Sequence, residues 1–142
     1  MSLPTVTPML SYEDPGAAAD WLCRAFGFAE ASRLTEDDGR VSHVELRLGG
    51  GAVMLGSPSG YVNPLQLRNR GAPGAWDTPY VIDGVHVLVE NVDAHARRAR
   101  EAGARLLSEP EDTPYGERIY RVEDVEGHRW MFAHVVKDSS SA

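Results

Sequence analysis

Apolar and polar positions along the first third of the chain alternate in a way that predicts a strand followed by a helix. A short apolar run over residues 6–12 is typical of a strand. Asp14 can cap a following helix, and Pro15 suits its first turn because no amide donor is needed there. Gly27 should end the helix. The apolar positions at helical spacing are Ala18, Trp21, Leu22, Ala25 and Phe26.

Three strands are predicted next, over residues 30–34, 41–48 and 52–55. The turn formers Asp37-Asp38-Gly39 and Gly49-Gly50-Gly51 separate them. The order of elements in this stretch is therefore βαβββ.

The same order starts again after a stretch without periodicity, residues 56–79. Residues 85–89 predict a strand, Asp93 is the expected cap of a second helix, and Gly103 is its expected end. Three further strands are predicted over residues 105–108, 118–122 and 128–135, with Glu126-Gly127 turning the last hairpin.

The two glycines that end the predicted helices, Gly27 and Gly103, stand 76 residues apart, which indicates a degenerate tandem repeat. We therefore expect an α+β fold of two βαβββ modules, with cupped mixed sheets and the helices outside. The modules should span residues 4–56 and 80–136. A connector over 57–79 and a flexible tail over 137–142 complete one domain.

Charge and composition exclude several classes of partner. The formal net charge of −7 disfavours nucleic acid, and no apolar run approaches the ~20 residues that cross a bilayer. Cys23 is the only cysteine, so an intramolecular disulfide is impossible and the cytoplasm is the expected location.

Three longer motifs carry a resemblance to a known family. They are Asp-x-x-x-Ala-x-x-Trp-Leu-x-x-x-Phe-Gly-Phe over residues 14–28, Asn-Val-Asp-Ala-x-x-x-Arg-Ala-x-x-Ala-Gly-Ala over 91–104, and Tyr-Gly-Glu-Arg followed by Asp-x-x-Gly-His-x-Trp over 115–130. With them the chain resembles the vicinal-oxygen-chelate superfamily of glyoxalases, bleomycin-resistance proteins and dioxygenases, most closely its PhnB-type branch. The resemblance implies paired βαβββ modules around a ligand site, and a homodimer.

The resemblance also implies where a metal ion would bind. Metal-using members place one ligand, usually His, Glu or Gln, on the first and the last strand of each module. Here the matching positions are Thr7, Leu55 or its neighbour Met54, Gly84 and Met131. None is a good ligand for a hard or borderline cation. We therefore expect no metal cofactor.

Strand alternation places several ionisable residues on the same faces as these positions. His43, Glu45 and Arg47 share the cup face if Val44 and Leu46 enter the core. By the same rule His86 joins Gly84, and Arg129 joins Met131. His43, Glu45 and His86 could bind a metal ion at unusual positions or act as acid and base on a substrate. Alternatively, His43 is an exposed sheet residue paired with its charged neighbours, and His86 is a hydrogen-bonded part of the cavity wall. His128 and His134 are expected on the helix side.

Tyr115 and Arg118 follow a Pro-Tyr-Gly turn and form a second candidate group, at the rim of the cup. They could hold an anionic or planar ligand, or Arg118 could pair with Glu111 or Asp112 and fix the loop. In the connector, Trp76 and Tyr80 either cap a ligand or anchor the loop by packing.

Two functions remain open at this point. The first is a metal-free protein that binds a small organic molecule in the cupped cavity. The second is a metal-dependent lyase, isomerase or dioxygenase with displaced ligands.

Overall fold

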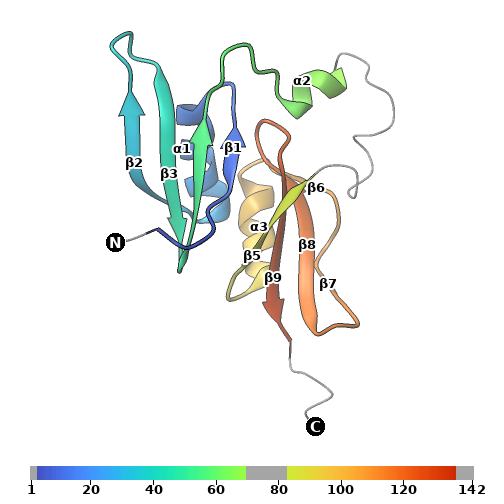
Figure 1. The fold of residues 1–142 in the computed structure, drawn as a ribbon. Coiled ribbons are helices and arrows are strands. Elements are labelled where there is room, and N and C mark those ends of the chain that lie inside the picture. Colours follow the sequence, from blue (N-terminus) through green and yellow to red (C-terminus); the bar gives the residue numbers. More distant parts are fainter. Residues whose placement is uncertain (1–2, 70–82, 137–142) are drawn as a thin grey trace.

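The chain folds into two modules of the same topology, shown in Figure 1 for a computed structural model that describes residues 3–69 and 83–136. The elements of the first module are β1 (Met9–Ser11), α1 (Pro15–Phe26), β2 (Ala29–Thr35), β3 (Val41–Leu48) and β4 (Gly51–Gly56). Those that follow are α2 (Pro64–Asn69), β5 (Gly84–Leu88), α3 (Val92–Glu101), β6 (Arg105–Leu106), β7 (Glu111–Asp112), β8 (Glu117–Glu123) and β9 (Arg129–Val135).

The two sheets have the same strand order. In the first module the order is β1-β4-β3-β2, and in the second it is β5-β9-β8-β6, with β7 paired to β8. β1 runs parallel to β4 and β5 parallel to β9, while the other pairs are antiparallel.

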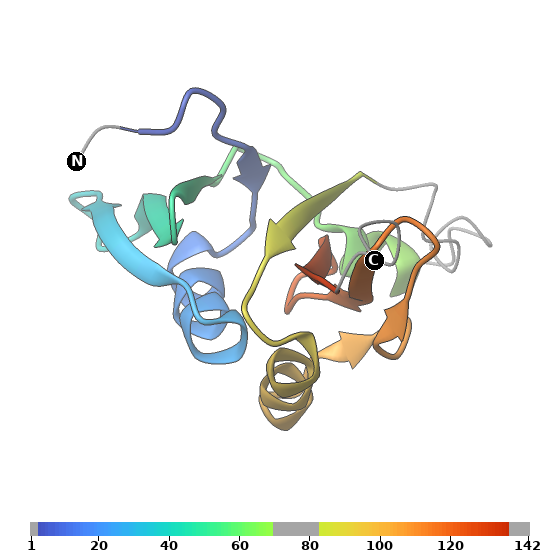
Figure 2. The same cartoon turned by 90° about the horizontal axis from the view of Figure 1, so that it is seen from below.

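The predicted α+β fold of two βαβββ modules is thereby confirmed. Helix α1 begins and ends where its local signals predict: Asp14 Oδ1 accepts a hydrogen bond from Ala17 N at 3.0 Å, and Gly27 has a φ of +87°. The helices α1 and α3 lie side by side outside the sheets (Figure 2). None of the helices in residues 3–69 and 83–136 is long and apolar enough to cross a membrane.

Several details differ from the sequence prediction. Asn91 rather than Asp93 caps α3, since Asn91 Oδ1 accepts from Ala94 N at 3.1 Å. The first strand is shorter than residues 6–12. β6 ends at Leu106, after which the N–H groups of Leu107 and Ser108 both donate to Arg121 O and the Ser108 hydroxyl accepts from Arg121 N. The helix α2 and the strand β7 were not predicted. Trp76, Tyr80 and the tail 137–142 lie outside the described residues.

One core joins the two modules. Its centre is aromatic, and Phe26 of α1 makes ring contacts with Trp130 and Phe132 of β9. His95 of α3 bridges the modules, because one ring nitrogen lies 2.8 Å from Phe26 O and the other 2.6 Å from the Tyr120 hydroxyl. Burial lowers the pKa of His95, so the ring is held neutral. These contacts hold the two modules against each other.

Candidate functional site

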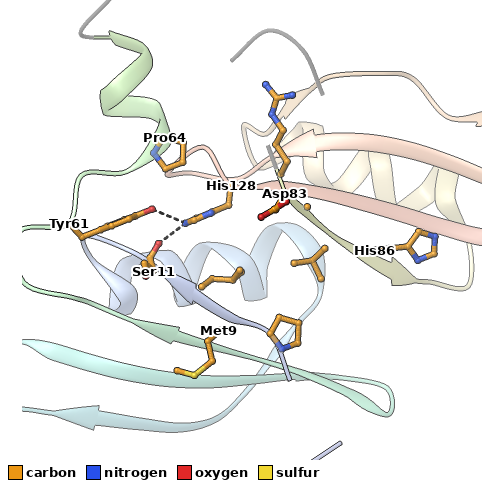
Figure 3. Close-up of a pocket in the computed structure, with 12 residues that line it drawn as sticks. Met9, Ser11, Tyr61, Pro64, Asp83, His86 and His128 are labelled. Carbon is orange, nitrogen blue, oxygen red and sulfur yellow. Dashed lines mark hydrogen bonds between the residues drawn. The ribbon is translucent and has the colours of Figure 1, made fainter. Parts of the chain in front are cut away.

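The edge strands of the two sheets, β1 and β5, face each other without pairing, and a cavity of about 860 Å³ lies between them. Residues 8–11 form one wall and residues 83–86 the other. His128, from the turn before β9, lies at one end together with Tyr61 and Pro64 of the connector (Figure 3). Arg129, the first residue of β9, also lines the cavity. We call this space the seam cavity.

A buried carboxylate holds the β8–β9 turn that forms this end. Asp124 is 6% exposed, and its Oδ2 accepts hydrogen bonds from the Tyr12 hydroxyl at 2.5 Å and from Trp130 Nε1 at 3.0 Å. Its Oδ1 accepts from the backbone N–H groups of Glu126 and His128, both at 3.0 Å. Burial raises the pKa of Asp124, against the effect of these donors. The turn is thereby fixed both to β9 and to Tyr12, the residue that follows β1.

A second carboxylate in the same turn reaches the other module. Glu126 accepts from the backbone N–H groups of Glu13 at 2.7 Å and Asp14 at 2.9 Å. It also accepts from Asn63 Nδ2 at 3.2 Å, and its own carbonyl accepts from Leu65 N at 3.2 Å. The turn therefore positions both the start of α1 and the connector beside the cavity.

His128 and Tyr61 present the polar groups at this end of the cavity. His128 Nε2 lies 2.5 Å from Ser11 O, so this nitrogen carries the proton and donates it to the carbonyl. The Tyr61 hydroxyl lies 3.4 Å from the same nitrogen (Figure 3). Burial, followed by the charges of Glu126 and Asp124, raises the pKa of Tyr61 to about 12. Tyr61 therefore keeps its proton at neutral pH and can donate it to a ligand.

Arg129 adds a buried cation to the cavity lining. Its Nη2 lies 3.6 Å from Glu123 Oε2, and both side chains are about one twentieth exposed. Arg105 Nη1 approaches the same carboxylate at 3.4 Å. The charge of Arg129 is thus balanced within the protein.

Three of the residues predicted from strand alternation lie in or at the seam cavity. His86 and Arg129 line it, and the Cε of Met131 lies 3.1 Å from where a Cβ on Gly84 would stand. The His86 ring is set apart from His128 and Asp83 (Figure 3) and pairs with Glu117 Oε1 at 3.0 Å.

The other candidates lie elsewhere. His43, Glu45 and Arg47 share the cup face of β3, because Val44 and Leu46 are fully buried; Glu45 and Arg47 pair at 2.5 Å. None of the three is among the described residues that line the seam cavity. Tyr115 is 68% exposed on the β7–β8 hairpin.

Arg118 is held in ion pairs with the helix α3 and the strand β7. Strand alternation turns its side chain toward α3, where Nε and Nη2 each lie 2.9 Å from an oxygen of Asp93. Nη1 lies 3.0 Å from Asp112, so the alternative pairing that the sequence left open is present. Arg118 therefore fixes the β7–β8 hairpin to the helix and does not line the described part of the cavity.

The four positions that match the family's metal ligands do not offer a suitable donor set. At the second position Leu55 is fully buried in the core, whereas its neighbour Met54, opposite Met9, faces the cup. Gly84 has no side chain, and Met54 and Met131 offer thioethers, which zinc and iron seldom use. Within residues 3–69 and 83–136 no group of three or more His, Cys, Asp or Glu side chains is placed to hold an ion.

Sequence reasoning missed the residues at the turn end of the cavity. His128 was expected on the helix side, but it precedes β9 and turns toward Ser11 and Tyr61 instead. His134 does face the helix, where its Nδ1 accepts from Val92 N at 2.9 Å. The Asp-x-x-Gly-His motif contained the signal, since it unites Asp124 and His128 in one turn.

Comparisons with known proteins agree with this geometry. A family model described as Glyoxalase/Bleomycin resistance protein/Dioxygenase superfamily matches residues 5–132. The uncharacterized protein Mb0911c of Mycobacterium bovis is 31% identical over 139 residues, covering 95% of this chain and 86% of that protein. The crystal structure of TioX from Micromonospora sp. ML1 is 33% identical, with a TM-score of 0.71 over 94% of this chain and 99% of that one. A glyoxalase/bleomycin resistance protein/dioxygenase family enzyme from Burkholderia phytofirmans PsJN is 20% identical, with a TM-score of 0.65 over 92% and 97% of the two chains, and shows the fold alone.

Proposed function

Since the chain belongs to the glyoxalase/bleomycin resistance protein/dioxygenase superfamily, we propose that it binds a small organic molecule in the seam cavity without a resident metal ion. The observation that carries this proposal is the cavity itself. Its volume of about 860 Å³ suits a metabolite or drug-sized compound, and its walls are mostly apolar. The Tyr61 hydroxyl, His128 and Arg129 supply a few polar groups that would orient such a compound.

Ligand binding can be tested with paired variants. In a thermal-shift screen of small organic compounds, hits should bind Tyr61→Phe about 3- to 10-fold more weakly, because the variant keeps the ring and loses one hydrogen-bond donor. Arg118→Ala is the matched control: its side chain lies outside the described cavity lining, so affinity should not change. Hits whose affinity falls in Arg118→Ala but not in Tyr61→Phe would indicate a ligand site outside the seam cavity.

Metal independence has its own test. Protein purified without chelators should contain far less than one zinc, nickel, manganese or iron ion per chain. A chelator should leave Tm unchanged, because no metal-binding free energy would be lost. A stoichiometric ion whose loss lowers Tm would instead favour a metal-dependent enzyme with displaced ligands, and substitution of His86 would then show whether that residue holds the ion.

We also propose a homodimer in the cytoplasm. Among the described residues, large apolar side chains that remain more than half exposed on the cup faces and their edges include Met9, Leu34, Leu88 and Val135. A second copy laid across the cup would cover them. Light scattering at micromolar concentration should give about twice the 15.5 kDa chain mass. A monomer mass at that concentration would contradict the dimer.

A further inference from the structure

The backbone of β5 offers an unused hydrogen-bonding edge to the seam cavity. In a parallel pair, alternate residues direct their N–H and C=O groups to opposite sides of the strand. Val89 N donates to Ala133 O at 2.8 Å, so the odd-numbered residues of this stretch face β9. The backbone groups of Gly84, His86 and Leu88 therefore face the seam. Within the described residues none of these groups bonds to a neighbouring strand on that side.

On the facing edge of β1, fewer backbone groups remain available for hydrogen bonds. Met54 N donates to Pro8 O and Tyr12 N to Gly56 O, so Met9 and Ser11 are the residues whose backbone groups face the seam. His128 already takes the carbonyl of Ser11. The edge of β5 is thus the longer row of available donors and acceptors.

The hollow beside this edge continues along the whole of β5. A second cavity of about 430 Å³ adjoins the first, and both are lined by Pro8, Val85 and His86. Its walls are apolar and include Phe28 and Leu48. Residues 8–11 and 83–86 line the first cavity, whereas residues 6 and 8 and residues 85–88 line the second. Moving from the first cavity to the second, the residue numbers fall on the β1 side and rise on the β5 side, so the two edges run antiparallel.

We propose that the seam takes a ligand with an extended amide backbone, a short peptide or peptide-like compound that adds as a strand along β5. Unpaired strand edges bind such chains through alternating N–H and C=O groups, and adjoining apolar pockets accept alternate side chains. The seam has both features. The stretch from Gly84 to Leu88 is ~13 Å long at the rise of a strand, which fits a chain of three to five residues. This inference rests on the proposed function, because it names the class of ligand for the same cavity.

A backbone variant can test it. His86→Pro removes the one N–H that β5 directs to the middle of the seam, while the bonds to β9 come from Val85, Val87 and Val89 and should remain. The control is His86→Ala, which removes the side chain and keeps the N–H. The probes are N-acetylated, C-amidated tetrapeptides with valine, leucine or phenylalanine at alternate positions. Each is paired with its N-methylated form and with aromatic acids and ketones that lack amides.

Calorimetry should show that the wild type binds at least one tetrapeptide. Because His86 itself lines the cavity, the affinity of His86→Ala is the reference for loss of the imidazole alone. His86→Pro should bind roughly 3- to 10-fold more weakly than His86→Ala, and N-methylation of the peptide should weaken binding to the wild type by a similar factor, the effect of one lost hydrogen bond. A peptide affinity that neither His86→Pro nor N-methylation lowers would overturn the inference. Binding of only the compounds without amides would overturn it and leave the proposed function intact. If no probe of either kind binds, both the inference of a peptide-like ligand and the proposed function fail. Should His86→Pro not fold, the N-methylated peptides decide the question on the wild type.

Discussion

Replacing Asp124 with alanine should lower the free energy of unfolding by about 3 to 5 kcal/mol. The carboxylate is buried and accepts from four donors, which belong to the Tyr12 hydroxyl, the Trp130 indole and two backbone amides of its own turn. Alanine would leave these donors buried without an acceptor, and water has little access to replace it. Urea unfolding followed by tryptophan fluorescence measures the change.

Two further variants separate this explanation from a general effect of removing an aspartate. Asp124→Asn keeps one acceptor oxygen and should lose less stability than Asp124→Ala. Asp20→Ala removes an aspartate that is two-thirds exposed and pairs with Arg33 at the surface, so its cost should stay near zero. A loss below about 1 kcal/mol in Asp124→Ala would show that the turn does not depend on the carboxylate.

The elements that the sequence predicted well are those whose signals lie within a few residues. Asp14, Pro15 and Gly27 all act on one helix, and α1 spans the residues between them. The repeat of that pattern near Gly103 was enough to predict two modules. Local sequence signals predicted the structure less well where a residue distant in sequence determines which local interaction forms. Asn91 and Asp93 are both good caps, and the contact of Asp93 with Arg118, 25 residues away, accompanies the choice of Asn91.

The candidate site was harder to predict because it lies between the modules. Its turn end depends on contacts of Glu126 and His128 with Glu13 and Ser11, more than 100 residues away in sequence. The pattern of apolar and polar residues along the chain carries no information about such contacts. The position of Leu55 shows a second limit. A shift of one residue along a strand moves a side chain from one face to the other, and the sequence alone left Leu55 and Met54 as alternatives.

Gly127→Ala should be the second variant with a large effect, lowering the free energy of unfolding by about 2 to 3 kcal/mol and weakening ligand binding. Gly127 has a φ of +95°, which costs an alanine ~1 to 2 kcal/mol. A Cβ there would also stand 2.8 Å from Leu65 N and 3.2 Å from Pro64 Cβ. The connector would have to move away, which would break the bond from Leu65 N to Glu126 O and shift the wall that holds Tyr61.

Gly39→Ala is the matched control for this experiment. Gly39 has a φ of +87°, nearly the same as Gly127, but nothing lies within 4 Å of its added Cβ. It should therefore show the backbone cost alone and leave ligand affinity unchanged. The difference between the two variants measures the contact of the turn with the connector. Equal losses of stability, with equal ligand affinities, would mean that the turn does not support the cavity wall. A larger loss in Gly127→Ala together with weaker binding would show that one turn glycine serves both the fold and the cavity.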